Sequence, residues 1–479
     1  MNPNSSTFST ITRLAVALGV TAIVVLLTMG YGFTQAQVVS SSVFTLIIVS
    51  TMCFWDFHLP IAFVGIAVLT MLNVMDLPRL IMQSHLDVIL FLVGMMIMVG
   101  ILRDLGLFSW VIVSVISSPG MTARRFVLTV CALGAVMSCM VDEMSTSVFI
   151  AALIFQVCDT LNVRPLPFIF MAVMSINIGT AGTMLGNPVG ILIGQNAAPP
   201  LSFVDFMRWS FPLMLAEFVV IMLFLLWTFR REIRAMNMEM GKRREMGMRL
   251  GPIVDLPFAQ GLLVLLLLMV MLSTHTIVES GLGLPRNTML IMSPLLLSGL
   301  MMLWRRDRVR HYIENDVQWV NLIFFMLLFV VAGTLEYTGV TTRLAGGFAA
   351  AFGPEKSAIL PAVLGISALG SAFIENIVFV AAFMPVVVQL GDTVLLWALL
   401  HGACLGGNIT MIGSTANMTA VAMLEKRYWT RVDFWVWLRT GFMVGVLSLL
   451  VAWAGLHWQA GKMPSVGERM RAAGMEIAD

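Results

Sequence analysis

The sequence predicts an all-α polytopic membrane protein built as two inverted repeats, with two re-entrant hairpins and two broken helices. Of its 479 residues, 59% are hydrophobic and 11% are charged, whereas soluble domains carry about 25% charged residues. Two acidic motifs interrupt apolar runs at equivalent places in the two halves, since 375 − 142 = 233. A stretch rich in Gly, Asn and Thr follows each acidic motif.

Apolar runs recur along the chain at lengths close to the roughly 20 residues that a membrane helix needs. We expect membrane spans near 11–30, 41–56, 58–75, 86–103, 166–195, 207–229, 257–275, 287–304, 317–335, 394–424 and 433–455. The first run also resembles a cleavable signal peptide, but its length favours a retained helix. The expected parts are an N-terminal helix (1–40), repeat 1 (41–229), a cytoplasmic linker (230–256), repeat 2 (257–455) and a C-terminal tail (456–479).

Two further apolar stretches, 126–158 and 358–390, contain acidic residues at their centres. A carboxylate at membrane depth costs roughly 2.5–3.5 kcal/mol on insertion scales, so it is a functional-site candidate. Each apolar flank is shorter than a full span. This favours a hairpin that enters and leaves on one side over two straight spans joined by a charged loop. The predicted hairpin tips carry Asp142, Glu143, Glu375 and Asn376.

Basic residues predict the orientation. They gather in 230–249, 305–316 and 425–431, which the positive-inside rule places in the cytoplasm. Counting spans then puts the N-terminus inside and the C-terminus outside, and an odd number of crossings gives the two halves opposite orientations. Inverted repeats with interrupted helices are the architecture of secondary transporters. The expected location is the plasma membrane, or the inner membrane of a bacterial cell.

The spans 166–195 and 394–424 each contain a break, and Thr183 of the first aligns with Thr410 of the second, since 410 − 183 = 227. Gly permits left-handed backbone and Pro removes a donor, so each break is expected to unwind a helix within the membrane. Such backbone persists only where it lines a cavity or is buried in protein. Helix packing through small residues is the alternative, which two matched breaks behind two matched tips disfavour.

Freed carbonyls and half-helix C-termini suit a cation, while half-helix N-termini suit an anion. We therefore expect the two breaks to bind the transported species. The predicted substrate-binding residues are Asn177, Gly179, Thr183, Gly186 and Asn187 in the first break, and Asn408, Thr410, Gly413, Ser414, Thr415 and Asn417 in the second. Residues 145–147 and 414–415 are expected to cap half-helices.

The tip residues are expected to couple transport to a proton or a cation. Asp142 and Glu143 are adjacent, so at least one should hold its proton unless a cation neutralises it. Glu375 is the single acid of the second tip, and Asn376 offers an amide oxygen as a ligand. A structural hydrogen bond at the hairpin base is the alternative. His401 is expected to be a packing or hydrogen-bonding residue rather than a proton relay.

These motifs resemble a known family. The segments are LFLVGMMIMVGILRDLGLF, NLIFFMLLFVVAGTLEYTGVTTRLA, SCMVDEMSTSVFIAALI, SAFIENIVFVAAFMPVV, NIGTAGTMLGNPVGILIG and GACLGGNITMIGSTANMTAVAMLEK. Together they are similar to the ion transporter superfamily, in its citrate transporter-like branch of arsenite permeases, P protein and D-type sodium/proton antiporters. The resemblance implies a homodimer with a fixed scaffold domain and a mobile transport domain. It also implies that the hairpin tips and the breaks form the binding site.

The sequence departs from that branch at three points. The branch usually has Asp-Asn at both tips, where this chain has Asp142-Glu143 and Glu375-Asn376. Gly190 stands where the first break usually has Asn. The Ser-Asn-Thr tip of the dicarboxylate branch is absent, which argues against succinate or citrate bound in that manner.

The function expected from these features is secondary active transport of a small anion or arsenite-like oxyanion, coupled to a proton or sodium gradient. A sodium/proton antiporter and a channel-like anion permease are the alternatives. An enzyme is disfavoured because the sequence has no His-Glu-x-x-His, Gly-x-Gly-Asp or Cys/His ligand spacing. We expect no cofactor other than a bound sodium ion. The expected partners are the transported ion, the lipid bilayer and a second copy of the chain, with no nucleic acid.

Overall fold

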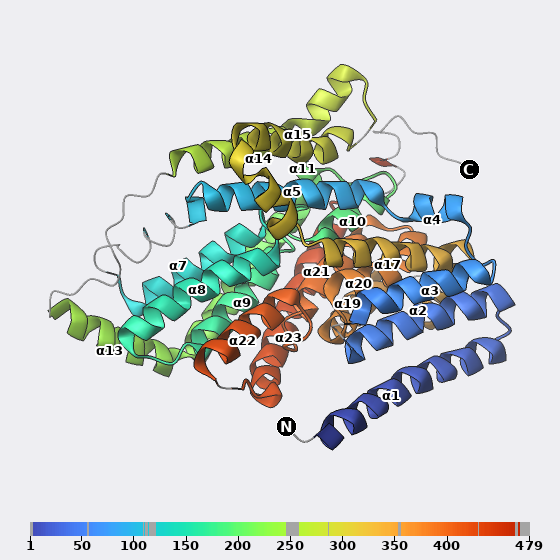
Figure 1. Cartoon of the computed structure of the whole chain (residues 1–479), viewed down its shortest axis with the longest axis horizontal. Helices are drawn as coiled ribbons and strands as arrows, with labels where there is room; N and C mark the ends of the chain where they lie inside the picture. Colours follow the sequence, from blue (N-terminus) through green and yellow to red (C-terminus); the bar gives the residue numbers. More distant parts are fainter. Residues whose placement is uncertain are drawn as a thin grey trace. The chain divides into compact units, whose positions relative to one another are not determined.

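The computed structural model describes residues 3–54, 57–108, 110, 114, 121–245, 258–285, 287–352, 356–429, 431–464 and 468–469 (Figure 1). Every regular element within these residues is helical, which confirms the all-α prediction. Parts of the predicted linker (246–256) and of the predicted tail (465–467 and 470–479) lie outside the described residues.

Seven described helices are long and apolar enough to cross a membrane: 12–30, 86–104, 143–161, 203–228, 259–282, 319–337 and 434–460. Other predicted spans are shorter helices. The predicted span 58–75 forms α3 (His58–Met71), which has 14 residues and is therefore about 21 Å long at 1.5 Å per residue. The predicted span 287–304 forms α15 (Thr288–Trp304), after which the chain bends by 105° into 306–316.

The chain folds into two compact units. The first comprises 1–90, 318–359 and 377–391. Its helices include α1 (Pro3–Gly30), α2 (Gln35–Cys53), α3, α4 (Leu77–Gln83), α17 (Trp319–Tyr337) and α18 (Val340–Phe352). The side chain of Gln37 on α2 donates to the Thr338 carbonyl at 2.9 Å, at the end of α17. This bond fixes two helices that are far apart in sequence side by side.

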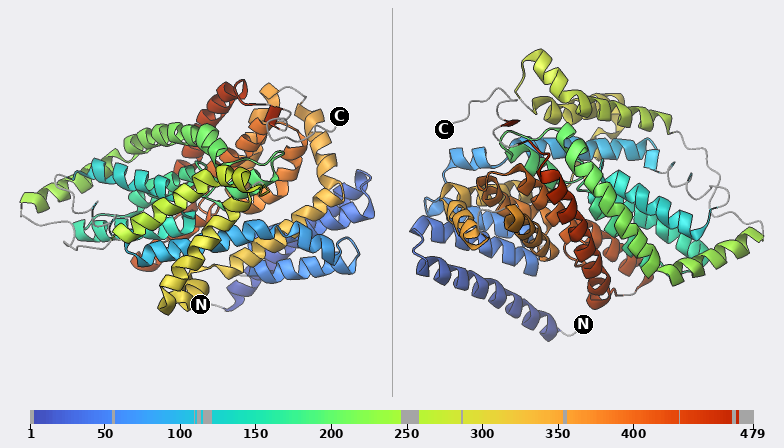
Figure 2. Two further views of the ribbon diagram at one scale, coloured as in Figure 1. Left: turned by 90° about the horizontal axis from the view of Figure 1, so that it is seen from above. Right: turned by 180° about the vertical axis from the view of Figure 1, so that it is seen from behind.

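The second unit comprises 91–317, 360–376 and 392–479, and it contains both tips and both breaks. Its longer helices are α5 (Leu86–Asp104), α7 (Ala123–Ser138), α8 (Glu143–Leu161), α9 (Leu166–Gly179), α12 (Phe211–Thr228), α13 (Arg230–Glu245), α14 (Ala259–Leu282), α15, α19 (Lys356–Phe373), α21 (Thr393–Gly406), α22 (Thr415–Tyr428) and α23 (Phe434–Ala460). Helices α7, α8 and α9 lie side by side (Figure 1), and α12 packs along α23 (Figure 2).

Each predicted tip and each predicted break lies between two helices of the chain. Helices α7 and α8 flank the first tip, and α19 and α20 (Asn376–Gln389) flank the second. The first break separates α9 from α10 (Pro188–Asn196), and the second separates α21 from α22. One expectation about length is wrong. Helix α8 has 19 residues and is long enough to span a membrane, because it begins at the tip acid Glu143 itself.

The predicted linker is not simply a solvated loop, because residues 230–245 form α13. Ile233, Met236 and Met240 recur at helical spacing and are buried, so the basic segment has an apolar face. Asn237 also accepts a hydrogen bond from the Ala123 amide at 3.1 Å, which ties α13 to the start of α7. The amphipathic pattern within the charged run accounts for this helix.

Candidate transport site

The two repeats build the same contact between hairpin and break. Thr183 donates to the carbonyl of Cys139, and Thr410 donates to the carbonyl of Ala372. The serine that precedes each of these hairpin carbonyls donates in turn to the helix before the break. Ser138 donates to the Ile176 carbonyl at 2.8 Å, and Ser371 donates to the Ala403 carbonyl at 2.7 Å. Thr183 and Thr410, which the sequence comparison of the two halves pairs, therefore make equivalent hydrogen bonds. These two threonines attach each break to its own hairpin.

The break glycines allow the backbones to approach. A Cβ on Gly186 would overlap the carbonyl oxygen of Ser138, and one on Gly413 would lie 2.9 Å from the carbonyl oxygen of Ser371. Gly179 is similarly confined, because a Cβ there would overlap Ser138 and Ala135 of α7. Backbone atoms cannot move aside as a flexible side chain can. The glycines therefore determine how closely the hairpin and the break pack, and their contact with substrate stays a prediction.

We expect Gly186→Ala to lower the stability of the protein by about 1–3 kcal/mol, because the added methyl group overpacks a site closed by backbone. Thermal unfolding of detergent-purified protein measures this effect. Gly346→Ala in α18 is the matched control, since a Cβ there has no neighbour within 4 Å. Equal melting of the two variants would contradict the proposed close approach.

Glu143 joins the two halves of the site. It is 5% exposed, and both of its carboxylate oxygens accept hydrogen bonds. Thr415 and Ser414 of the second break donate to Oε1 at 2.7 and 3.2 Å. Asn187 of the first break donates to Oε2 at 3.1 Å. One hairpin-tip acid is therefore held by both breaks.

Three helices begin around this carboxylate. Glu143 is the first residue of α8, Asn187 caps α10 by accepting from the Val189 amide at 2.9 Å, and Ser414 caps α22 by accepting from the Ala416 amide at 3.1 Å. Helix N-termini carry partial positive charge and favour anions. The converging N-termini therefore stabilise a negative group where Glu143 lies.

Buried amides connect the two breaks next to Glu143. Asn177 is fully buried and donates from its amide nitrogen to Asn408 and Asn417, both at 2.9 Å. Its amide oxygen lies 3.0 Å from the Ser414 hydroxyl, whose single proton is shared between Asn177 and Glu143. Asn417 in turn donates to the Gly407 and Thr410 carbonyls at 2.7 and 2.9 Å. The amides thus satisfy the carbonyls that unwinding of α21 leaves without helical partners.

The remaining tip residues have separate places. Asp142 is the N-cap of α8 and accepts from the Ser145 amide at 2.8 Å, so an acid caps this helix rather than the expected residues 145–147. Asn376 is fully buried. With its amide nitrogen toward the second break, it donates to the Gly413 carbonyl at 2.9 Å and to Ala403 at 3.3 Å. Glu375 precedes it and is half-buried. The coupling roles of these three residues stay predictions.

A second buried polar cluster lies beside the first break. His401 contacts Glu217 through Nδ1 at 2.8 Å and Ser210 through Nε2 at 2.9 Å. Ser210 also donates to the Ala181 carbonyl at 2.5 Å. Glu217 and His401 are fully buried. The expectation that His401 forms hydrogen bonds is confirmed, but the sequence reasoning missed Glu217. The signal was present, because Glu217 is a carboxylate within the predicted span 207–229.

The hydrogen bonds of this cluster indicate where its protons lie. The single Ser210 proton points to the Ala181 carbonyl, so His401 must donate to Ser210 from Nε2. One further proton then lies between His401 Nδ1 and Glu217. The pair is neutral overall whether that proton resides on the histidine or on the carboxyl group. Loss of that proton would leave the unprotonated Nδ1 of His401, an acceptor, facing the buried carboxylate of Glu217.

The comparisons with known proteins agree with this architecture. The family model described as citrate transporter matches residues 7–402. The "46 kDa membrane protein" of Mycobacterium leprae is 30% identical over 386 residues, which cover 76% of this chain and 84% of that protein. The P protein of Homo sapiens is 24% identical over 462 residues, which cover 78% of this chain and 54% of that protein.

The fold is also similar to a solved transporter structure. The YdaH transporter of Alcanivorax borkumensis superposes with a TM-score of 0.54 at 16% identity, over 81% of this chain and 88% of that one. The resemblance to the ion transporter superfamily is thereby confirmed. Since the family model spans most of the sequence, this chain is a multi-pass membrane transporter that belongs to the citrate transporter family.

Proposed function

We propose that the chain is a secondary active transporter that moves a small anion or oxyanion and couples this movement to a proton or sodium gradient. The observation that carries the proposal is the position of Glu143, buried and hydrogen-bonded to both breaks. The family name denotes citrate, but the tip lacks the Ser-Asn-Thr sequence of the dicarboxylate branch. We therefore propose an anion smaller than citrate, such as an arsenite-like oxyanion.

The geometry supports coupling through charge at Glu143. Its carboxylate occupies the place that three helix N-termini make favourable for an anion. A charged Glu143 therefore competes with a substrate anion for the same donors. A proton on Glu143, or a sodium ion beside it, removes this competition. Anion binding then favours the neutralised form of the acid, and the two species bind together by linkage.

The position of the site residues supports transport as one body. Every predicted tip and break residue belongs to the second unit of the chain, from Asp142 to Asn417. Because the hydrogen bonds from Glu143 hold both breaks together, a displacement of this unit would carry the whole site with it. This agrees with the mobile transport domain that the family resemblance implies. The homodimer and the inside–outside orientation remain part of the proposal.

A sodium/proton antiporter is the second candidate. The Glu217–His401 pair favours it, because these two buried side chains share one proton that the anion mechanism does not use. The three acids at the hairpin tips would also suit exchange of protons for a cation. A channel-like anion permease would use the same site without coupling, and it would carry currents far above carrier turnover.

Proteoliposomes loaded with a pH-sensitive dye separate these functions. We expect addition of phosphate outside to acidify the lumen, because the anion enters with a proton that it releases again at neutral pH, and a sodium jump without anion to leave the lumen pH unchanged. For sodium coupling, anion uptake would instead require sodium outside. A pH change driven by sodium alone would establish the antiporter and overturn the anion proposal. Empty liposomes and Glu143→Gln protein are the controls.

A further inference from the structure

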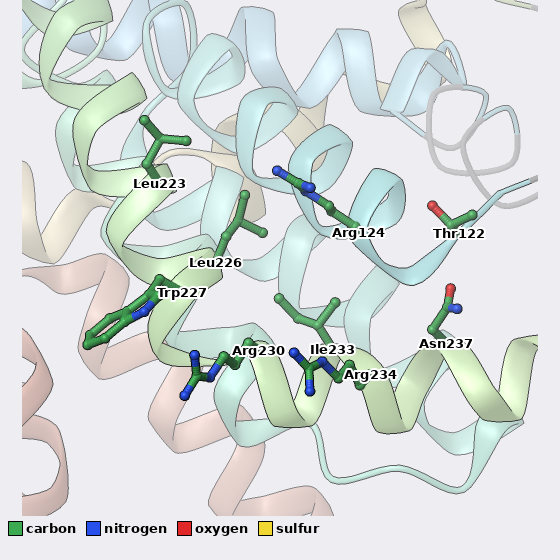
Figure 3. A pocket seen from close by; sticks show the side chains of 9 residues that line it. All are labelled: Thr122, Arg124, Leu223, Leu226, Trp227, Arg230, Ile233, Arg234 and Asn237. Carbon is green, nitrogen blue, oxygen red and sulfur yellow. The ribbon is translucent and has the colours of Figure 1, made fainter.

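A groove of about 560 Å³ opens between three elements of the second unit, and Glu143 is not among its lining residues (Figure 3). Helix α12 provides one wall, α13 provides another, and the start of α7 closes the third side. The lining residues are Thr122, Arg124, Leu223, Leu226, Trp227, Arg230, Ile233, Arg234 and Asn237. Its volume is within the range of small-molecule sites.

The charged side chains that line this groove are all basic. Arg124, Arg230 and Arg234 line it, and no carboxylate of the described residues lies within 4.0 Å of their guanidinium groups. Two acidic residues of α13, Glu232 and Glu239, line a separate cavity of about 450 Å³. The groove is therefore an unneutralised cationic site, and guanidinium groups bind phosphate in bidentate geometry.

The other wall of the groove is apolar and belongs to a membrane helix. Leu223 and Trp227 are 59% and 65% exposed on α12, which is part of a candidate span that ends at Thr228. Arg230 follows two residues later and lies 5.8 Å from the Trp227 ring centroid. Trp is enriched where a span meets the headgroup region. The groove thus runs from hydrocarbon depth to the level of lipid headgroups.

The groove is preformed. The apolar face of α13 buries Ile233 and Met236, and Asn237 accepts from the Ala123 amide at 3.1 Å. These contacts hold Arg230 and Arg234 on the face opposite Arg124. Figure 3 shows the side chain of Arg124 extending toward Leu223 and Leu226. The cationic and apolar parts are therefore fixed next to each other before any ligand arrives.

We propose that this groove binds one anionic phospholipid, with the phosphate between the three arginines and an acyl chain along the apolar α12 wall. A soluble phosphate would use the arginines but not Leu223, Leu226 and Trp227. A zwitterionic lipid would use the apolar wall but would bring its own cation to the arginines. An anionic lipid is the ligand that matches both parts, and basic pockets between membrane helices on the cytoplasmic side suit such headgroups.

Native mass spectrometry of delipidated protein in detergent tests the proposal, with phosphatidylglycerol as the probe and phosphatidylcholine as its neutral-lipid control. We expect phosphatidylglycerol to be retained and Arg230→Gln/Arg234→Gln to weaken its binding by about tenfold. Arg231→Gln/Arg243→Gln is the matched control, since it removes the same charge from α13 outside the groove. Arg124→Gln, on α7, should weaken binding without changing α13.

Each other outcome overturns the proposal. Equal loss of phosphatidylglycerol binding in both double variants would mean that the lipid is attracted by the overall positive charge of α13 and not by the groove. Equal retention of phosphatidylcholine would mean that the arginines do not select the lipid. Binding of glycerol 3-phosphate as strong as that of phosphatidylglycerol would assign the groove to a soluble anion. Thermal unfolding of each variant without lipid shows whether it is folded, and Arg124→Gln provides an independent test if the double variant is not.

Discussion

Glu143→Gln is expected to reduce coupled transport by tenfold or more while leaving the protein folded. The substitution keeps the size of the side chain but removes its charge and replaces one acceptor oxygen with a donor. Either Asn187 or the pair Ser414 and Thr415 then faces a donor instead of an acceptor. Hydrogen bonds to a charged group contribute about 1.5–3 kcal/mol, so the loss of one alone accounts for a tenfold effect. Dye-monitored flux in proteoliposomes measures it.

Asp142→Asn separates coupling from capping. Asn is as good an N-cap as Asp, so this variant should keep α8 intact, yet we expect it and Glu375→Gln to lose or uncouple transport. Asp433→Asn is the matched control, because Asp433 caps α23 by accepting from the Trp435 amide at 2.8 Å. Coupled flux of wild-type size in the Glu143, Asp142 and Glu375 variants would remove the tip acids from the mechanism.

The sequence could predict which residues gather at the candidate site, because burying charge in a membrane is costly wherever it occurs. This cost identified the tips, and the offset of 233 residues from Asp142 to Glu375 paired them. The offset also makes Glu143 the counterpart of Asn376. The sequence could not show that Glu143 contacts both breaks whereas Asn376 contacts the second break. That difference depends on three-dimensional contacts with Asn187, Ser414 and Thr415.

The helix α13 and the buried carboxylate Glu217 were not predicted from the sequence, each for a physical reason. The amphipathic pattern of α13 is obscured by its many charges, and only Ile233, Met236 and Met240 reveal the buried face. Glu217 was missed because no second signal accompanied it: its partner His401 follows 184 residues later. A pairing of this kind needs the fold, whereas the adjacency of Asp142 and Glu143 is visible along the chain.

Removing one partner of the Glu217–His401 pair is expected to destabilise the protein strongly. Glu217→Ala leaves His401 Nδ1 buried without its partner. We expect this variant to lose about 3 kcal/mol of unfolding free energy. This value is the upper end of the range for a buried neutral group without a partner and the lower end of the range for a buried charge without one. Glu217→Gln should cost about 1 kcal/mol or less, because its amide nitrogen can donate to Nδ1 in place of the shared proton. Thermal unfolding in detergent compares the two variants.

Replacing both partners completes the test. In Glu217→Leu/His401→Leu no member of the pair is orphaned, and Ser210 keeps its bond to the Ala181 carbonyl. The double variant should therefore be about 1–3 kcal/mol more stable than the sum of the single effects predicts, the coupling expected for buried partners. Additive effects would mean that the two side chains do not share a proton. If the pair also takes part in antiport, the stable Glu217→Gln variant should lose the sodium-driven pH change, while a purely structural pair would leave that flux unaltered.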